Sequence, residues 1–372
     1  GTDREVSGMN HHGTRILNFV LVFSICLVLP ASAWGKDIQL DIRPGEGVTD
    51  QRKLSDYFPL LRDSNLDTDV FILDSGKPGA TGLIIGGTHG NEMAGSVSAL
   101  VALENAVVTE GRLIVIPYTN RSAQSVADTR NEIDPRHLIQ SRGGERYLTY
   151  GDRRTDIVDQ KSEDPDEYRN PGGYVLKNGK ESRNLNRTYP GKQDGTPTEQ
   201  LAYAIITLVK KEQVDFSLDM HEANTPETDT RDNGDYRPGG NKRLSYTLVS
   251  HPRGLEIAAY ALLAMEEDTH ISMKLEESNT EYRGLSHLEI GDATSCLSYL
   301  SESPNPGQDR SRKNADVVSD SKYPLTHRVG MHLRLFKHLA DAYADYNDKS
   351  LIIENLPEYQ DLLAGDIGQF LN

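Results

Sequence analysis

The sequence has little of what stabilises small disulfide-rich scaffolds or anchors a protein in a membrane. Its 372 residues include only 2 cysteines, so a disulfide framework is excluded, and tryptophan occurs once. Beyond the N-terminal region, no stretch approaches the ~20 apolar residues that a transmembrane helix needs. Basic residues are also scarce, because 40 Lys and Arg face 56 Asp and Glu, for a formal net charge of −16. This acidity argues against nucleic acid and anionic lipid as partners of an otherwise ordinary soluble globular protein.

The N-terminal region carries the pattern of an export signal. Arg15 precedes an apolar run over residues 16–29, and small residues with Ala-x-Ala spacing end at Ala33. This pattern is typical of a secretory signal peptide that is cleaved after Ala33. We therefore expect an exported protein, periplasmic or secreted, with no stable membrane span after cleavage; an uncleaved N-terminal anchor is the alternative. Cleavage would remove Cys26 and leave Cys296 as the only thiol of the mature chain.

Short β-rich runs alternate with longer helical runs along most of the remaining chain. Thr196, Pro197 and Glu199 have the spacing of a helix N-terminus with a capping box. Strands that alternate with helices predict an α/β fold with a mostly parallel sheet covered by helices. The expected strands cover residues 70–73, 82–85, 113–116, 214–220, 244–249, 271–275 and 296–301, and the expected helices cover residues 92–105, 253–267 and 327–346 besides the one that begins after Thr196.

The chain divides into parts on this pattern. We expect a signal peptide over residues 1–33, a lead-in over 34–68, a main domain over 69–346 and a C-terminal extension over 347–372. Within the main domain, periodicity fails over residues 131–182, which we interpret as a long irregular insertion. Such a segment is either a solvated excursion or a wall or lid of a site, and its place just before a motif favours the wall.

Two motifs at expected strand ends carry imidazole and carboxylate groups. The string Gly-Gly-Thr-His-Gly-Asn-Glu places His89 and Glu92 three residues apart, where one turn of chain can aim both at one metal ion. This spacing is weak by itself, and His221, at the end of another strand, is the candidate third ligand. Two histidines and one glutamate suit zinc and leave a position open for catalysis. Asp219 or Glu222 could orient a liganding imidazole, although Glu222 is equally well a surface carboxylate.

A further string, Arg-Asn-Leu-Asn-Arg-Thr-Tyr-Pro-Gly, is suited to binding a carboxylate. Arg187 offers a planar two-pronged fork and Asn186 a further donor, a combination that fits the carboxylate of a substrate. A structural salt bridge is the alternative role of Arg187. Tyr282 is a candidate for substrate contact through its phenol, although packing is the simpler role for one tyrosine among 17.

Together the motifs resemble the zinc carboxypeptidases in the broad sense, and within them the succinylglutamate desuccinylase/aspartoacylase branch. The resemblance implies a mixed, mostly parallel twisted sheet flanked by helices and one Zn²⁺ per chain, held by His89, Glu92 and His221. It covers roughly residues 69–306 and rests on four strings in the family's order: Gly-Thr-His89-Gly-Asn-Glu92, Asn-Leu-Asn186-Arg187-Thr-Tyr-Pro-Gly, Asp219-Met-His221 and Ser301-Glu302-Ser303-Pro304.

The resemblance also implies a catalytic glutamate late in the chain and an arginine that stabilises an oxyanion. Glu302 matches the family's context at the end of an expected strand, and Glu289 is its rival. The insertion interrupts the family's spacing for the arginine. Arg130 is the first choice by its distance from Asn120, and Arg183 is the alternative.

These residues predict a zinc metallohydrolase that cleaves an amide bond next to a free carboxylate. Zinc would activate water, and Glu302 would act as general base. The expected partner is a peptide or small-molecule substrate with a free carboxylate. A metallocarboxypeptidase that trims peptides and a deacylase for N-acyl amino acids both fit this chemistry. A zinc- or peptide-binding protein without catalysis is a third alternative.

Overall fold

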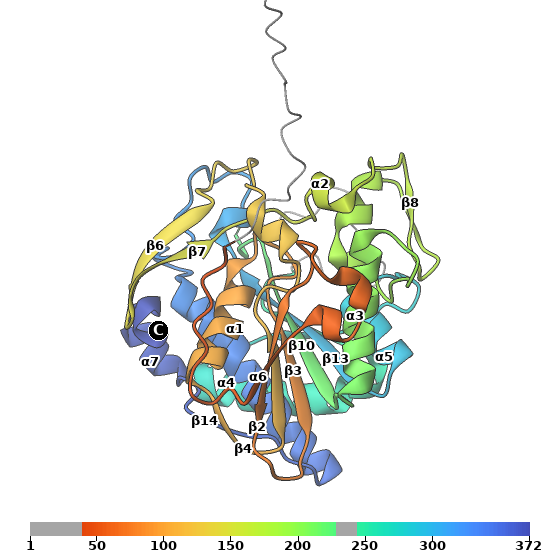
Figure 1. The fold of residues 1–372 in the computed structure, drawn as a ribbon. Helices are drawn as coiled ribbons and strands as arrows, with labels where there is room; N and C mark the ends of the chain where they lie inside the picture. The colour runs from red at the N-terminus through yellow and green to blue at the C-terminus, as the bar shows by residue number, and fades with distance from the viewer. Residues whose placement is uncertain (1–38, 228–243) are drawn as a thin grey trace, which may run out of the picture. The chain divides into compact units, whose positions relative to one another are not determined.

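The computed structural model describes residues 39–227 and 244–372, and the expected signal peptide lies outside these ranges. Figure 1 shows their arrangement. Among the described residues, no helix is long and apolar enough to cross a bilayer. The strands are β1 (Asp50–Lys53), β2 (Asp69–Asp74), β3 (Thr81–Ile85), β4 (Val107–Glu110), β5 (Arg112–Ile116), β6 (Arg136–Ser141), β7 (Gly144–Thr149), β8 (Tyr168–Arg169), β9 (Val175–Leu176), β10 (Phe216–Ala223), β11 (Thr247–Ser250), β12 (Lys274–Glu277), β13 (Leu297–Pro304) and β14 (Ile352–Glu354). The α-helices are α1 (Met93–Asn105), α2 (Ile157–Gln160), α3 (Pro197–Lys211), α4 (Leu255–Thr269), α5 (Ser286–Ala293), α6 (Leu325–Asn347) and α7 (Tyr359–Ala364).

A mixed 8-stranded sheet forms the centre of the fold, in the order β1-β2-β5-β3-β10-β13-β11-β12. The central strands β5, β3, β10 and β13 run parallel to one another, as do β11 and β12. The pairs β1–β2, β2–β5 and β11–β13 are antiparallel. The predicted fold class, a mixed and mostly parallel sheet flanked by helices, is therefore confirmed. The carboxyl ends of β3, β10 and β13 meet at one edge of the sheet, where parallel α/β sheets place their ligands.

Alternation along the strands gives the sheet two buried faces. In β10, Leu218 and Met220 belong to the core that contains α1, α4 and α6. Because successive side chains of a strand point to opposite faces, Asp219 and His221 face the other side. That side is covered by α3 and α5, at the right of Figure 1, and its core holds Ile290 of α5. Asp219 and His221 thus share one face of β10.

The expected strands and helices are present with bounds shifted by a few residues. The capping box before α3 forms as predicted, because the Thr196 hydroxyl accepts from the Glu199 N–H at 3.3 Å and the Glu199 carboxylate accepts from the Thr196 N–H at 3.0 Å. The strand that carries Glu302 continues to Pro304, so this residue lies near the strand end instead of after it. Helix α5 was not expected, since its 8 residues are too few to show a clear helical spacing of apolar side chains.

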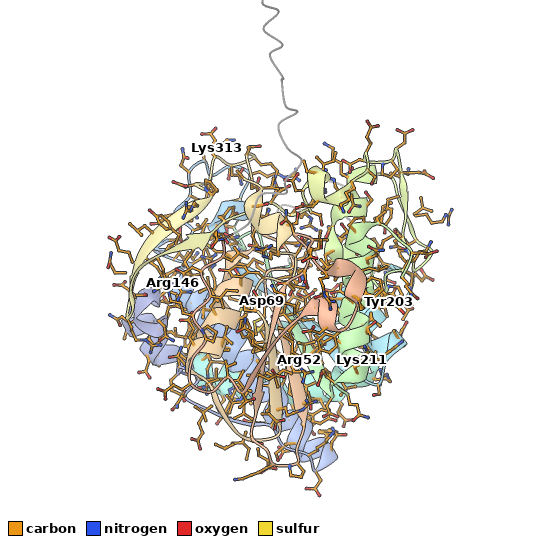
Figure 2. The ribbon with its side chains drawn as sticks, viewed as in Figure 1. Arg52, Asp69, Arg146, Tyr203, Lys211 and Lys313 are labelled. Atoms are coloured by element: carbon orange, nitrogen blue, oxygen red, sulfur yellow. The ribbon has the colours of Figure 1, made fainter. Side chains whose placement is uncertain are left out.

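The described part of the expected lead-in and the expected C-terminal extension belong to the same compact unit as the expected main domain. Strand β1 of the lead-in pairs with β2, and β14 of the C-terminal extension pairs with β4. Residues 131–182, interpreted from the sequence as irregular, contain the hairpin β6–β7. Polar residues interrupt the alternation of that hairpin in the sequence. Its Arg146, labelled in Figure 2, donates to Glu104 of α1 at 2.8 Å and fastens the hairpin to the core.

A buried ion pair joins the sheet to its longest helix. Arg328 of α6 donates from Nε to Oε2 of Glu222 at 2.7 Å and from Nη2 to Oε1 at 2.9 Å. Both side chains are fully buried. Because Glu222 follows His221 in β10, this pair also fixes the strand end that carries a candidate ligand.

Removing the cation of this pair should destabilise the fold strongly. Arg328→Met leaves a buried carboxylate without its counter-ion, so we expect the free energy of unfolding to fall by about 3–5 kcal/mol in urea denaturation. Lys337→Met, which breaks the exposed pair with Asp341 on the same helix, is the matched control and should cost less than about 1 kcal/mol. A similar small loss for both variants would contradict the role assigned to the buried pair.

Candidate active site

The ends of β3 and β10 bring the three predicted metal ligands together. Among the described residues, His89, Glu92 and His221 form a buried group whose ligand atoms all lie within 4.8 Å of one another. Gly87 makes the turn after β3 with φ +66°, and a Cβ there would lie 2.8 Å from the carbonyl oxygen of Pro117. This turn directs His89 over the end of the neighbouring strand β10, because β3 and β10 are parallel and paired.

The candidate ligands are oriented by their neighbours. Nδ1 of His89 lies against the Glu92 carboxylate, and Nδ1 of His221 lies 3.5 Å from the other carboxylate oxygen. On the far side of the rings, Nε2 of His221 lies 2.9 Å from Asp219 and Nε2 of His89 lies 2.8 Å from the amide oxygen of Asn184. Partners on the second nitrogen fix ring orientation and leave Nδ1 of both rings facing the carboxylate.

The structure separates the two carboxylates that had been candidates for orienting an imidazole. Asp219 contacts His221 and also accepts hydrogen bonds from Thr88 at 2.8 Å and Ser286 at 2.6 Å. Glu222 points to the opposite face of β10, where it binds Arg328. Asp219 is therefore the orienting residue, and Glu222 has a structural role in the interior instead of lying on the surface.

Charge accumulates in this buried group and requires a cation. Burial lowers the pKa of His89 to about 4, which leaves the imidazole neutral and able to ligate at neutral pH. Burial opposes the ionisation of Glu92 and of His221, but the attraction between them prevails. His89 and His221 together hold the pKa of Glu92 well below its usual range, and Asp219, together with Glu92, raises the pKa of His221 well above its usual value. In the protein alone, a protonated His221 is thus the cation among these carboxylates.

This group has the properties of a metal site. Two imidazole nitrogens and one carboxylate face one another, all three are buried, and both rings are held through their second nitrogens. A divalent cation would replace the proton of His221 and neutralise the carboxylate charge. Two histidines and a glutamate form a donor set that zinc prefers, with three protein ligands as in catalytic sites. The residues therefore fit the expected metal.

Glu302 and its rival Glu289 have different surroundings. In the parallel pairing of β10 with β13, Glu302 stands directly opposite His221, so the two side chains share one face of the sheet. Glu302 is buried, with 6% of its surface exposed. Glu289 of α5 instead accepts from Arg283 at 2.7 Å and from the backbone of Gly284 at 2.9 Å. Glu289 therefore fastens a loop, whereas Glu302 lies beside the candidate metal group.

The predicted carboxylate clamp lies in the next turn of chain. Asn186 and Arg187 belong to a short 3-10 helix, η5 (Leu185–Arg187), which directly follows the Asn184 that contacts His89. The amide oxygen of Asn186 accepts from the backbone of Ser286 at 2.8 Å. The guanidinium of Arg187 lies 5.6 Å from the centre of the Tyr282 ring. The structure thus brings Asn186, Arg187 and Tyr282 together, close to the candidate ligands.

The two arginines considered for the oxyanion are both engaged elsewhere. Arg130 makes a two-pronged contact with Asp128 at 3.0 and 2.8 Å, and 56% of its side chain is exposed. Arg183 makes a two-pronged contact with Asp164 at 2.6 and 2.9 Å. Each guanidinium is therefore paired with a carboxylate.

Arg153 is an arginine of the insertion that the sequence analysis did not single out. The chain around it is held against the strand-end loop, because Gly90 donates to the carbonyl of Asp152 at 2.7 Å and Gly151 donates to the carbonyl of Gly90 at 2.8 Å. Burial lowers the pKa of Arg153, and its charge in turn lowers the pKa of His89. Among the described residues, no ion pair occupies its guanidinium. The sequence offered no signal for it beyond its place in the insertion expected to form a wall.

No protein-family model and no curated protein matches the chain. Solved structures with a similar chain trace include a succinylglutamate desuccinylase from a Silicibacter species, with 15% identity over 75% of this chain and 60% of that one and a TM-score of 0.39. Product-bound cell shape determinant protein Csd4 from Helicobacter pylori has 14% identity over 80% and 59%, with a TM-score of 0.45. A succinylglutamate desuccinylase/aspartoacylase from Rhodobacter sphaeroides has 18% identity over 83% and 69%, with a TM-score of 0.41.

These are structures of the branch that the motifs resemble. The chain covers less than two thirds of the length of the first two. At such low identity and TM-score, we base the function on the residues of the site.

The contact between Asp219 and His221 should be needed for metal affinity. Asp219→Asn removes the charge that orients the ring, and we expect the affinity for Zn²⁺ to fall by about 10–100-fold in competition with a chromophoric chelator. Asp292→Asn is a matched control, because Asp292 contacts His251 at 2.8 Å in a histidine–carboxylate pair outside the site. Equal zinc affinity in the two variants would rule out the orienting role of Asp219.

Proposed function

We propose that this protein is an exported zinc-dependent hydrolase, like a metallocarboxypeptidase, that cleaves an amide bond next to a free carboxylate. One observation carries the proposal. Three groups lie together at the ends of β3, β10 and β13. They are the buried His-Glu-His group, the Glu302 carboxylate opposite His221, and the arginine that would bind a carboxylate. Export rests on the N-terminal leader pattern alone.

Each side chain has a role in this reaction. His89, Glu92 and His221 would hold a zinc ion, which when bound would supply the Lewis acidity that lowers the pKa of water and polarises a carbonyl. Arg187 and Asn186 bind the free carboxylate of the substrate and so fix the position of the adjoining amide bond. Glu302 takes a proton from the attacking water and delivers it to the leaving amine. Arg153 donates hydrogen bonds to the carbonyl oxygen as it gains negative charge.

The order of these groups along the sheet supports this assignment. Glu302 lies opposite His221, on the strand next to the ligand strand, and the clamp lies beyond Asn184 on the same face. The oxyanion role comes to Arg153 because its charge acts on His89 and Glu92, whereas Arg130 and Arg183 are paired with Asp128 and Asp164.

A second candidate reaction uses the same machinery. An N-acyl amino acid also has a free carboxylate next to an amide bond, and the motifs resemble those of the desuccinylase/aspartoacylase branch. A panel of peptides and N-acyl amino acids, with release of free amine measured in the presence and absence of a chelator, separates the two reactions. Zinc binding without turnover of either class would favour a non-catalytic binding protein and contradict the proposal.

Glu302 should be required for turnover but not for metal binding. Glu302→Gln keeps the size of the side chain and removes its basicity, so we expect turnover to fall by about 10²–10⁴-fold while one zinc per chain is retained. Metal content by elemental analysis and amine release on the same preparation measure both effects. Wild-type turnover in this variant would exclude Glu302 as the base.

Arg153 should affect the chemical step. Arg153→Ala removes an oxyanion donor, and we expect kcat to fall by about 10²–10³-fold in steady-state kinetics. Arg130→Ala is the matched control, since it removes the same charge at an exposed position next to Asp128 and should retain the wild-type kcat. A loss confined to Arg130→Ala would return the oxyanion role to Arg130.

A further inference from the structure

A cavity of about 490 Å³ lies between strands β11 and β12, at one edge of the sheet, and the loop that leads into α5. Its wall includes Val249, Glu276, Ser278, Tyr282, Leu285 and His287. Its volume lies within the range of about 300–1,000 Å³ that is typical of ligand pockets. None of the chemistry assigned above uses this space.

The cavity adjoins the clamp for the substrate carboxylate. Tyr282 lines the cavity, and its ring centre lies 5.6 Å from the guanidinium of Arg187. Leu285, also in the wall, precedes the Ser286 whose N–H donates to Asn186 at 2.8 Å. A substrate whose carboxylate rests on Arg187 therefore has the cavity beside it, where a side chain on the same carbon can enter.

The cavity also lies on the same face of the sheet as Glu302. Thr247 of β11 is paired with Glu302, and Val249, two residues further along β11, is paired with Glu276 of β12. Residues two apart in a strand point to the same face, so Val249 lies on the face of Thr247 and Glu302. Glu276, which is paired with Val249, lies on that face too. The side chain of Glu276 thus belongs to the side of the sheet on which substrate binds.

Glu276 has one carboxylate oxygen without a hydrogen-bond donor in the described part of the chain. Its Oε2 atom is buried and has no hydrogen-bond partner among the described residues. The hydroxyl of the neighbouring Ser278 is engaged elsewhere, because it contacts the carbonyl of Ser250 at 3.0 Å and Nδ1 of His287 at 2.6 Å. A buried carboxylate oxygen without a donor is costly, and a cationic ligand would supply the missing donor.

Building on the proposed function, we propose that this cavity binds the positively charged end of a substrate side chain. The substrate class is an amide whose carboxylate-bearing residue carries a primary amine on an aliphatic stem, as lysine does. The Glu276 carboxylate is the counter-ion, and Val249 and Leu285 cover the stem. The formal net charge of −16 on the whole chain also favours the approach of a cationic substrate.

Calorimetric binding of two matched peptides tests this proposal. The ligands are acetyl-alanyl-lysine and acetyl-alanyl-norleucine, which differ in the amine, and the protein is the zinc-loaded full chain with Glu302→Gln to prevent turnover. We expect the lysine peptide to bind at least about 10-fold more tightly, because a hydrogen bond to a charged group is gained. Adding Glu276→Gln should bring the ratio of the two affinities close to one.

Glu281→Gln in the same background is the matched control, since it removes the same charge from an exposed position in the loop before α5. It should keep the preference for the lysine peptide. Equal binding of the two peptides to the parent protein would overturn the proposal, as would a preference that survives Glu276→Gln. The parent protein alone thus decides the question if a variant is unstable. Tight but equal binding would leave the carboxylate clamp intact, whereas binding of neither peptide would reject the proposed function as well.

Discussion

The burial of Glu92 and Asp219 beside two imidazoles is the constraint on which the rest of the site depends. These carboxylates lie at the ends of two parallel strands, away from water, and their charge must be balanced by a cation. Asp219 is held by hydroxyl groups from Thr88 and Ser286, and the Glu92 carboxylate accepts from the backbone of Glu222 at 2.8 Å. Such an arrangement is costly for folding alone, but it suits a group that holds a metal ion.

Backbone hydrogen bonds join segments that are far apart in the sequence to the loop that carries the candidate ligands. Backbone hydrogen bonds between Gly90 and Gly151 and between Gly90 and Asp152 hold the segment of Arg153 against the loop of His89. Thr155 then donates to the carbonyl of Arg183 at 2.8 Å and joins the same segment to the turn that carries the clamp. Part of the insertion is therefore held against both the loop of His89 and the turn of Asn186 and Arg187.

Most of the fold and the metal group could be predicted, because both leave local marks in the sequence. Alternating strands and helices reveal the sheet. His89 follows β3 and His221 lies near the end of β10, and these two strands are parallel neighbours. Arg153 could not be predicted, since its position depends on backbone contacts between distant glycines and not on spacing from a motif. The cavity beside Glu276 escaped prediction for a similar reason, because an edge strand and a loop form its wall only after folding.

The most direct test compares a free-carboxylate amide substrate with its carboxamide-blocked counterpart, on protein of known metal content. We predict one zinc per chain, hydrolysis of the free-carboxylate substrate that a chelator abolishes and added zinc restores, and little cleavage of the blocked substrate. Hydrolysis that survives complete removal of the metal, or equal cleavage of the two substrates, would contradict a metal-dependent site that recognises its substrate by a carboxylate.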